Sequence, residues 1–241
     1  VRLAGTTVTN ATLHNQDYIT EKDIRIGDTV VVQKAGEIIP EIVSVVREKR
    51  PEGTTPYHLP ETCPVCGAPV ERDPDGAAIR CTGAECPAQL LRNLIHFASR
   101  DAMDIDGVGP AVMRQLIESG LVSNPADLYD LRAEQLADLE RMGTKSAQNA
   151  VDAIAKSKEN DLWRLIFALG IRQVGAKAAK ILAAHFGSME ALRRATAEEL
   201  TQIDDVGAVT ADYIIRWMSS DQAADLLERL KAAGVNMESR Q

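Results

Sequence analysis

The segment that decides the fold is Ile171-Arg-Gln-Val174-Gly175-Ala-Lys177-Ala-Ala179, because its pattern occurs four times along the chain. The four copies lie near residues 105–113, 139–147, 171–179 and 203–211. Their last glycines are 34, 32 and 32 residues apart, and an alanine follows four residues later in every copy except the first, which has Met113. Repetition at such a period indicates repeated supersecondary units.

Each copy predicts two helices joined by a tight turn. The Val or Met is expected to lie beneath the turn, and the glycine permits a conformation or a close approach that a Cβ would bar. The first amides of the second helix lack intrahelical partners, and with the helix dipole they form a site for a phosphate oxygen. This is the helix-hairpin-helix motif, which grips the DNA backbone without reading base sequence.

The predicted DNA contacts in these hairpins are turn glycines and two lysines that follow them: Gly107, Gly109, Gly143, Lys145, Gly175, Lys177 and Gly207. The copies are unequal, since Asp204 and Asp205 precede the glycine of the fourth, where an anion would repel phosphate. The alternative interpretation is four plain helical hairpins with glycine caps. The net charge of −8 argues against a broad basic surface but not against phosphate binding by backbone amides.

Four cysteines form a second pattern, Cys63-x2-Cys66 and then Cys81-x4-Cys86. Two close pairs of thiolates make a tetrahedral sulfur cage that suits a structural Zn²⁺, and Gly67 lets backbone amides turn toward the sulfurs. Because all four positions are filled, the zinc would have no open position for catalysis. The alternative is two disulfides or four unrelated thiols, which the lack of a secretory signal disfavours.

The chain is predicted to contain an all-β domain, a zinc finger and an all-α domain. Short Val, Ile and Thr-rich runs over residues 1–50 fit a small barrel of the oligonucleotide-binding (OB) type, although another small barrel would fit as well. This domain is assigned to residues 1–60, and the prolines of 51–62 indicate a linker. Pro40 within the strand 38–46 suggests an edge or a bulge. The finger is assigned to residues 61–87, and residues 88–241 carry helical spacing and the four hairpins.

Composition excludes several classes of protein. The 241 residues are 45 % hydrophobic and 26 % charged, which is ordinary for a globular protein. No apolar run approaches the ~18 residues that span a bilayer, and no signal peptide is visible. A cytoplasmic protein without membrane contact is expected. The chain begins with Val1 rather than Met, which suggests a piece of a longer protein.

Several segments resemble bacterial NAD-dependent DNA ligases, and they follow one another in a single order through nearly the whole chain. They are residues 1–15 (VRLAGTTVTNATLHN), 24–28 (IRIGD), 35–40 (AGEIIP), 63–67 (CPVCG), 86–89 (CPAQ), 142–149 (MGTKSAQN) and 168–172 (ALGIR). The resemblance implies an OB barrel, a zinc finger and a helix-hairpin-helix domain.

The resemblance also implies an enzyme that seals nicks in double-stranded DNA during replication and repair. In that chemistry a lysine attacks NAD to form lysyl-AMP, AMP passes to the 5′-phosphate, and the 3′-hydroxyl displaces it, with Mg²⁺ balancing charge. Such an enzyme is expected to be a monomer in the bacterial cytoplasm, associated with the nucleoid. Ile38 and Ile39 match an apolar pair that the family places against the minor groove, although both could equally be strand core.

Departures from the family locate the chemistry outside this sequence. The nucleotidyl-transfer motif Lys-x-Asp/Asn-Gly is absent, and Lys22-Asp23 is followed by Ile24 instead. No residue is therefore predicted to be catalytic, and the fragment alone is expected to be inactive, with the adenylation domain of the same polypeptide as its partner. The first barrel strand is expected to precede Val1, and the carboxy-terminal BRCT domain is absent.

Two other functions remain open. One is a non-enzymatic DNA-structure binder with tandem helix-hairpin-helix motifs, which the helical region alone would support. The other is a nuclease accessory domain, although no Asp, Glu and His cluster at two-metal spacing supports it. The segment 35–40 and the zinc finger that precedes the hairpins favour the ligase.

Overall fold

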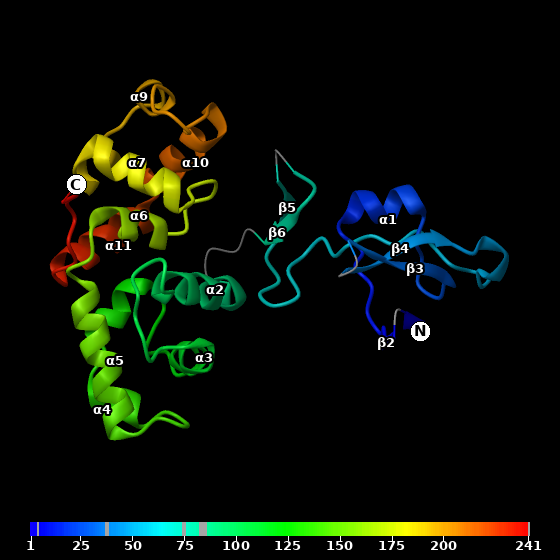
Figure 1. Cartoon of the computed structure of the whole chain (residues 1–241), viewed down its shortest axis with the longest axis horizontal. Helices are drawn as coiled ribbons and strands as arrows, with labels where there is room; N and C mark the ends of the chain where they lie inside the picture. The colour runs from blue at the N-terminus through cyan, green and yellow to red at the C-terminus, as the bar shows by residue number, and fades with distance from the viewer. Residues whose placement is uncertain (4, 37–38, 74–75, 82–85, 241) are drawn as a thin grey trace. The chain divides into compact units, whose positions relative to one another are not determined.

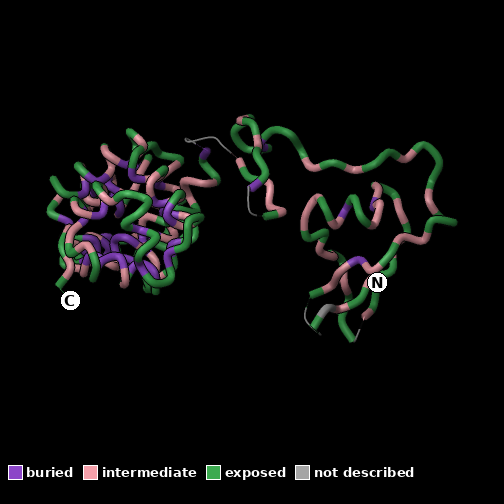
Figure 2. The backbone as a smooth tube through the Cα atoms, turned by 90° about the horizontal axis from the view of Figure 1, so that it is seen from above, coloured by how far each residue is buried: buried purple, intermediate pink, exposed green. Residues whose placement is uncertain are grey.

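The computed structural model describes residues 1–3, 5–36, 39–73, 76–81 and 86–240. The chain forms two compact units, an amino-terminal unit Val1–Cys86 and a helical unit Pro87–Gln241 (Figure 1). Buried residues concentrate in the helical unit, while the amino-terminal unit is mostly exposed or half-buried (Figure 2). None of the helices described is both long and apolar enough to cross a membrane.

The amino-terminal unit is built from short antiparallel strand pairs and one helix. The described strands are β1 (Arg2–Leu3), β2 (Thr6–Thr7), β3 (Val30–Ala35), β4 (Ile39–Val45), β5 (Val70–Arg72) and β6 (Ile79–Cys81). They pair as β1–β2, β3–β4 and β5–β6. A 3-10 turn, η1 (Arg47–Lys49), follows β4.

The hairpin of β3 and β4 is the longest sheet of this unit. Its register shifts between Val31 and Val32, so the expected irregularity lies in this hairpin but away from the proline. Pro40 pairs opposite Lys34, and its carbonyl accepts a hydrogen bond of 2.8 Å from the Thr12 amide. Pro40 thus takes part in the strand pairing although proline has no N–H to donate.

Helix α1 (Gln16–Lys22) lies in the region that was expected to be all β, and the sequence analysis missed it. Asn15 caps the helix by accepting a hydrogen bond of 2.9 Å from the Tyr18 amide, and Asp23 ends it in the left-handed conformation. The helix buries Ile19 against Ile24 and Ile42, the three buried residues of a small core.

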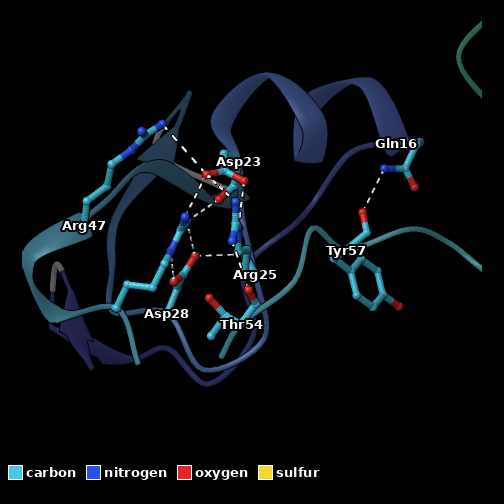
Figure 3. A network of polar contacts seen from close by, with 8 residues as sticks. Gln16, Asp23, Arg25, Asp28, Arg47, Thr54 and Tyr57 are labelled. Carbon is cyan, nitrogen blue, oxygen red and sulfur yellow. Dashed lines mark hydrogen bonds and ion pairs between the residues drawn. The ribbon is translucent and has the colours of Figure 1, made fainter. Parts of the chain in front are cut away.

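A network of charges joins the end of α1 to the segment after β4 (Figure 3). The Arg50 guanidinium donates to Asp23 at 2.7 Å and to Asp28 at 2.8 Å, and Arg25 donates to Asp23 at 2.9 Å. The Asp28 side chain is 1 % exposed and that of Arg50 is 15 % exposed. Hydrogen bonds from Arg50 and then Arg25 lower the pKa of Asp23 to about 2.

The proline-containing segment after η1 is held by hydrogen bonds from Gln16 and Arg25 of the same unit. Gln16 donates to the Tyr57 carbonyl at 3.1 Å and accepts from the Leu59 amide at 2.7 Å. Arg25 donates to the Thr54 carbonyl at 3.0 Å. Side chains thus satisfy a backbone stretch that has no strand partner of its own.

The helical unit contains two tandem pairs of hairpins. Their described elements are α2 (Pro87–Ala98), α3 (Pro110–Glu118), η2 (Pro125–Asp130), α4 (Ala133–Ala137), α5 (Thr144–Ser157), α6 (Leu162–Ala168), α7 (Ala176–Phe186), α8 (Met189–Arg193), α9 (Ala197–Thr201), α10 (Ala208–Met218) and α11 (Asp221–Ala232). One continuous apolar core draws buried residues from each of these elements and includes Leu94, Leu116, Leu165 and Leu182.

The two pairs repeat one another closely. In the first pair the connecting turn η2 starts after Asn124, and in the second α8 starts after Ser188. Each of these caps lies nineteen residues before the glycine of the next hairpin, Gly143 or Gly207. The equal spacing indicates that one tandem unit occurs twice.

The carboxy-terminal segment joins the two pairs. Arg229 of α11 contacts Asp127 of η2 at 2.6 Å. After the helix, the Asn236 amide donates to the Lys158 carbonyl at 2.9 Å, and the Met237 carbonyl accepts from the Met189 amide at 2.9 Å. This segment therefore fixes the first pair relative to the second.

We expect Arg50→Gln to destabilise the amino-terminal unit while leaving the helical unit unchanged. Because the folded-state pKa of Asp23 lies below the unfolded value of about 3.9, the network stabilises fully above that pH. Its contribution is lost as the pH falls toward about 2. Pepsin digestion between pH 4 and pH 2, with mass identification of the fragments, measures the loss.

Arg47→Gln is the matched control, since Arg47 is 70 % exposed and reaches Asp23 only at 3.9 Å. Equal acid resistance of the two variants would show that the Arg50 network does not hold this unit together.

Candidate nucleic-acid interface

The four repeats fold as helical hairpins, and in each the last glycine is the N-cap of the second helix. These glycines have φ values of −66°, −121°, −81° and −78° at Gly109, Gly143, Gly175 and Gly207. Such values are open to any residue, so the expectation that these glycines supply a special conformation is wrong. Closure of the turn does not require them.

The left-handed residue lies two positions earlier in every hairpin. Its φ is 87°, 63°, 64° and 67° at Gly107, Arg141, Gln173 and Asp205. Only the first copy uses glycine there, and at that position a Cβ would also approach the Cβ of Ala150 to 3.2 Å. Glycine at position 107 thus avoids both the strain of the left-handed conformation and a tight contact with Ala150.

The four N-cap glycines also share the free space around them. A Cβ built at any of the four would meet no atom of the described chain within 4 Å. Neither backbone conformation nor internal packing thus excludes a side chain there. The space beside each of these helix starts is therefore free of other atoms of the described chain.

Capping separates the hairpin helices from most of the others. α3, α5, α7 and α10 begin without a side-chain cap. Side chains instead cap the starts of α1, η2, α6, α8, α9 and α11. The first amides of the hairpin helices are thus available to an external acceptor, except at Pro110, which has no N–H.

The remaining positions of the repeat hold the hairpins together. Met113, Ala147, Ala179 and Ala211 are buried, and the amide of each donates to the N-cap glycine carbonyl at 2.9 Å. Val108, Val174 and Val206 are buried beneath their turns, while Met142 is half-buried. The expectation for these apolar positions is confirmed.

The two predicted lysines differ in their surroundings. Lys145 is exposed in the first turn of α5. Lys177, in the first turn of α7, forms an ion pair with Asp205 of the fourth hairpin at 2.5 Å, which raises the pKa of the lysine. Asp205, which was expected to repel phosphate, is therefore also the ion-pair partner of Lys177, a predicted phosphate contact.

Sequence reasoning missed a group of cations that lie on aromatic rings near the third hairpin. Lys180 Nζ lies 4.6 Å from the Trp163 ring centre, and Arg164 lies 5.0 Å from the same ring. Arg172 lies 5.4 Å from the Tyr213 ring. A cation three residues after Lys177 on a helix was the available signal for Lys180.

The apolar pair at the start of β4 is only partly described. Ile39 is 53 % exposed, which excludes strand core for this side chain. Ile38 lies outside the described residues. An exposed isoleucine at a hairpin end can contact a groove edge or another apolar surface.

The four cysteines converge although they come from two separate segments of the chain. Their sulfurs all lie within 4.8 Å of one another, with 3.9 Å between Cys63 and Cys86 and 3.4 Å between Cys66 and Cys81. Tetrahedral Zn–S bonds of about 2.3 Å place sulfurs roughly 3.8 Å apart, whereas a disulfide needs about 2.05 Å. The donor set and its spacing therefore fit zinc.

The first cysteine turn is shaped to hold a thiolate. Gly67 adopts a φ of 74°, and its amide donates to the Cys63 carbonyl at 2.9 Å. Amide hydrogen bonds from Cys66 and Val65 lower the pKa of the Cys63 thiol to about 7. Cys81 ends β6 opposite Val70. Bound zinc would supply the cross-link of this small subdomain.

Comparison with known proteins agrees with this arrangement. Residues 1–54 match the NAD-dependent DNA ligase OB-fold domain, and residues 62–88 match the NAD-dependent DNA ligase C4 zinc finger domain. The chain thus contains two domains of the NAD-dependent DNA ligase family. Residues 99–156 match a SAM-like helix-hairpin-helix tandem, and residues 164–227 match a helix-hairpin-helix motif.

Similar ligases cover nearly all of this chain. It is 57 % identical over 238 residues to the DNA ligase of Heliobacterium modesticaldum, covering 99 % of the chain and 35 % of that protein. It is 55 % identical over 239 residues to the DNA ligase of Symbiobacterium thermophilum, covering 98 % of the chain and 36 % of that protein. The chain thus spans about a third of the length of these ligases.

We expect one Zn²⁺ per chain, bound by Cys63, Cys66, Cys81 and Cys86. Native mass spectrometry of the reduced protein measures this stoichiometry. Cys81→Ser should lower zinc affinity and unfold the finger, since metal binding supplies on the order of 10 kcal/mol to such a small subdomain. The helical unit should keep its tryptophan fluorescence, because Trp163 and Trp217 both lie there. Disulfides without metal in the reduced protein would contradict the assignment.

Proposed function

We propose that this chain is the DNA-holding portion of an NAD-dependent DNA ligase, and that it holds nicked double-stranded DNA through backbone phosphates. One observation carries the proposal. The four hairpin helices begin at open glycines without side-chain caps, while six other helical elements are capped by their own side chains.

Phosphate suits these helix starts for two reasons. Uncapped amides donate hydrogen bonds to anionic oxygens, and the positive end of the helix dipole favours the same charge. Neither interaction depends on base identity, so binding would be independent of sequence. It also allows a chain of net charge −8 to bind a polyanion, because the donors are neutral amides.

The proposed contacts divide between the two units. In the helical unit they are the residues predicted above, Gly107, Gly109, Gly143, Lys145, Gly175, Lys177 and Gly207, with Gly107 acting through the turn geometry. In the amino-terminal unit, exposed Ile39 would lie against the minor groove together with Ile38. Apolar side chains commonly contact the minor groove in proteins that hold or deform duplex DNA.

The parent enzyme would supply the covalent chemistry in replication and repair. We infer that its adenylation domain, on the same polypeptide, forms lysyl-AMP from NAD and uses Mg²⁺, while this region holds the substrate. The protein would act as a monomer in the bacterial cytoplasm at the nucleoid. A purely structural DNA binder would share the hairpins, but the OB-fold and C4 zinc finger matches favour the ligase.

Leucine at Gly109 or Gly175 should weaken duplex binding by blocking phosphate approach. The fold should survive, because a Cβ at either position meets nothing within 4 Å and the φ values are ordinary. Lys145→Ala should reduce the slope of log affinity against log salt by about one unit, since one lysine releases roughly one counterion. Fluorescence anisotropy with a nicked duplex over a salt series measures both effects.

Glu118→Leu is a control at the far end of α3, where no phosphate contact is proposed. Circular dichroism verifies folding of each variant. If folded Gly109→Leu and Gly175→Leu bind like wild type, the repeat is architecture alone and DNA contact lies elsewhere.

Incubation with NAD should leave the mass of this chain unchanged. The 241 residues contain no Lys-x-Asp/Asn-Gly motif to supply the nucleophile. Intact-mass spectrometry after incubation with NAD and Mg²⁺ is the measurement, with an intact bacterial ligase as the positive control. A gain of one AMP would show that a lysine of this chain performs adenylation and would overturn the division of labour.

A further inference from the structure

The third and fourth hairpins are joined by one ion pair between residues 28 positions apart. Lys177 Nζ lies 2.5 Å from Asp205 Oδ2, and the two side chains are 79 % and 47 % exposed. Lys177 is the second residue after the third N-cap glycine, and Asp205 is the left-handed residue of the fourth turn. The lysine that is proposed to contact a phosphate is thus already in an ion pair with the Asp205 carboxylate.

The corresponding positions in the first tandem pair carry different charges. Ala111 is the second residue after Gly109, and Arg141 is the left-handed residue of the second turn. The first pair therefore has a cation where the second pair has an acid, and no lysine at the position of Lys177. The two tandem units share a fold but differ in charge at the same places.

We propose that Asp205 acts as an internal competitor of DNA phosphate for Lys177, so that the second tandem pair holds DNA more weakly than the first. This inference rests on the proposed function. A phosphate that engages the start of α7 must displace a carboxylate from Lys177, whereas Lys145 at the start of α5 lies in a hairpin whose turn carries Arg141. In this proposal Asp205 makes no contact with DNA itself, and its effect passes through Lys177.

The strength of this competition is limited by exposure. An exposed Lys–Asp pair is screened by water and contributes little, which corresponds to about a two- to fivefold effect on an equilibrium. The contact therefore adjusts affinity and does not block binding. It also makes the second pair easier to release than the first, because part of its binding energy is spent on breaking an existing contact.

Asp205→Asn tests the proposal without disturbing the turn, because asparagine tolerates the left-handed conformation. We expect about two- to fivefold tighter binding to a nicked duplex and a salt slope steeper by about one unit. Lys177→Ala with Asp205→Asn should bind no more tightly than Lys177→Ala alone. Glu190→Gln is the matched control, since it removes one charge from a similarly exposed ion pair, with Arg194, outside the hairpins.

Each outcome decides the matter. Unchanged affinity in Asp205→Asn overturns the competition. So does a gain that persists without Lys177 or that Glu190→Gln reproduces, because the effect is then general charge. If wild type binds the duplex and Gly109→Leu weakens it, while Asp205→Asn has no effect, only this inference fails. If wild type does not bind duplex DNA, the proposed function fails and the inference with it.

Discussion

The chain depends on where the backbone N–H groups at helix starts find their acceptors. A helix leaves its first amides without intrahelical partners, and burial or desolvation of such groups is costly. Side chains such as Asn15, Ser188 and Ser220 satisfy this need at helices that serve architecture. At the hairpin helices no side chain does so, and glycine keeps the opening clear. The buried Ala or Met one turn later holds each open end in place, so the unsatisfied groups are fixed before any ligand arrives.

The two units reach stability by different means. The helical unit buries a continuous apolar core that runs through both tandem pairs, and α11 joins the pairs through Arg229 and the segment that follows. Among the residues described in the amino-terminal unit, the buried apolar cluster consists of Ile19, Ile24 and Ile42. Charged groups around Arg50 and a four-thiol site support it instead. Small subdomains with too little apolar surface commonly rely on such cross-links.

Local patterns were predictable from the sequence, whereas contacts between distant residues were not. The hairpins and the cysteine turns follow from residues only a few positions apart, so their motifs identified them. Helix α1 escaped because seven residues bury only Ile19 and leave no helical stripe, although Asn15 was a usable cap signal. The left-handed turn position escaped because three of its four residues, Arg141, Gln173 and Asp205, are not glycine. The Lys177–Asp205 pair joins two repeats and has no local signal.

The two tandem units share one fold but can differ in the charge of their exposed turn residues. The left-handed position closes the turn whatever side chain it carries, so its charge is free to differ between copies: glycine, arginine, glutamine and aspartate all occur there. The second residue of the second helix is likewise exposed in every copy, as Ala111, Lys145, Lys177 or Val209. The side chains at these two positions, such as Lys177 and Asp205, can thus differ in charge between the tandem pairs without loss of core packing. In the proposed function, backbone amides would provide a phosphate site common to the repeats, and side-chain charges would then set how tightly each tandem pair binds DNA.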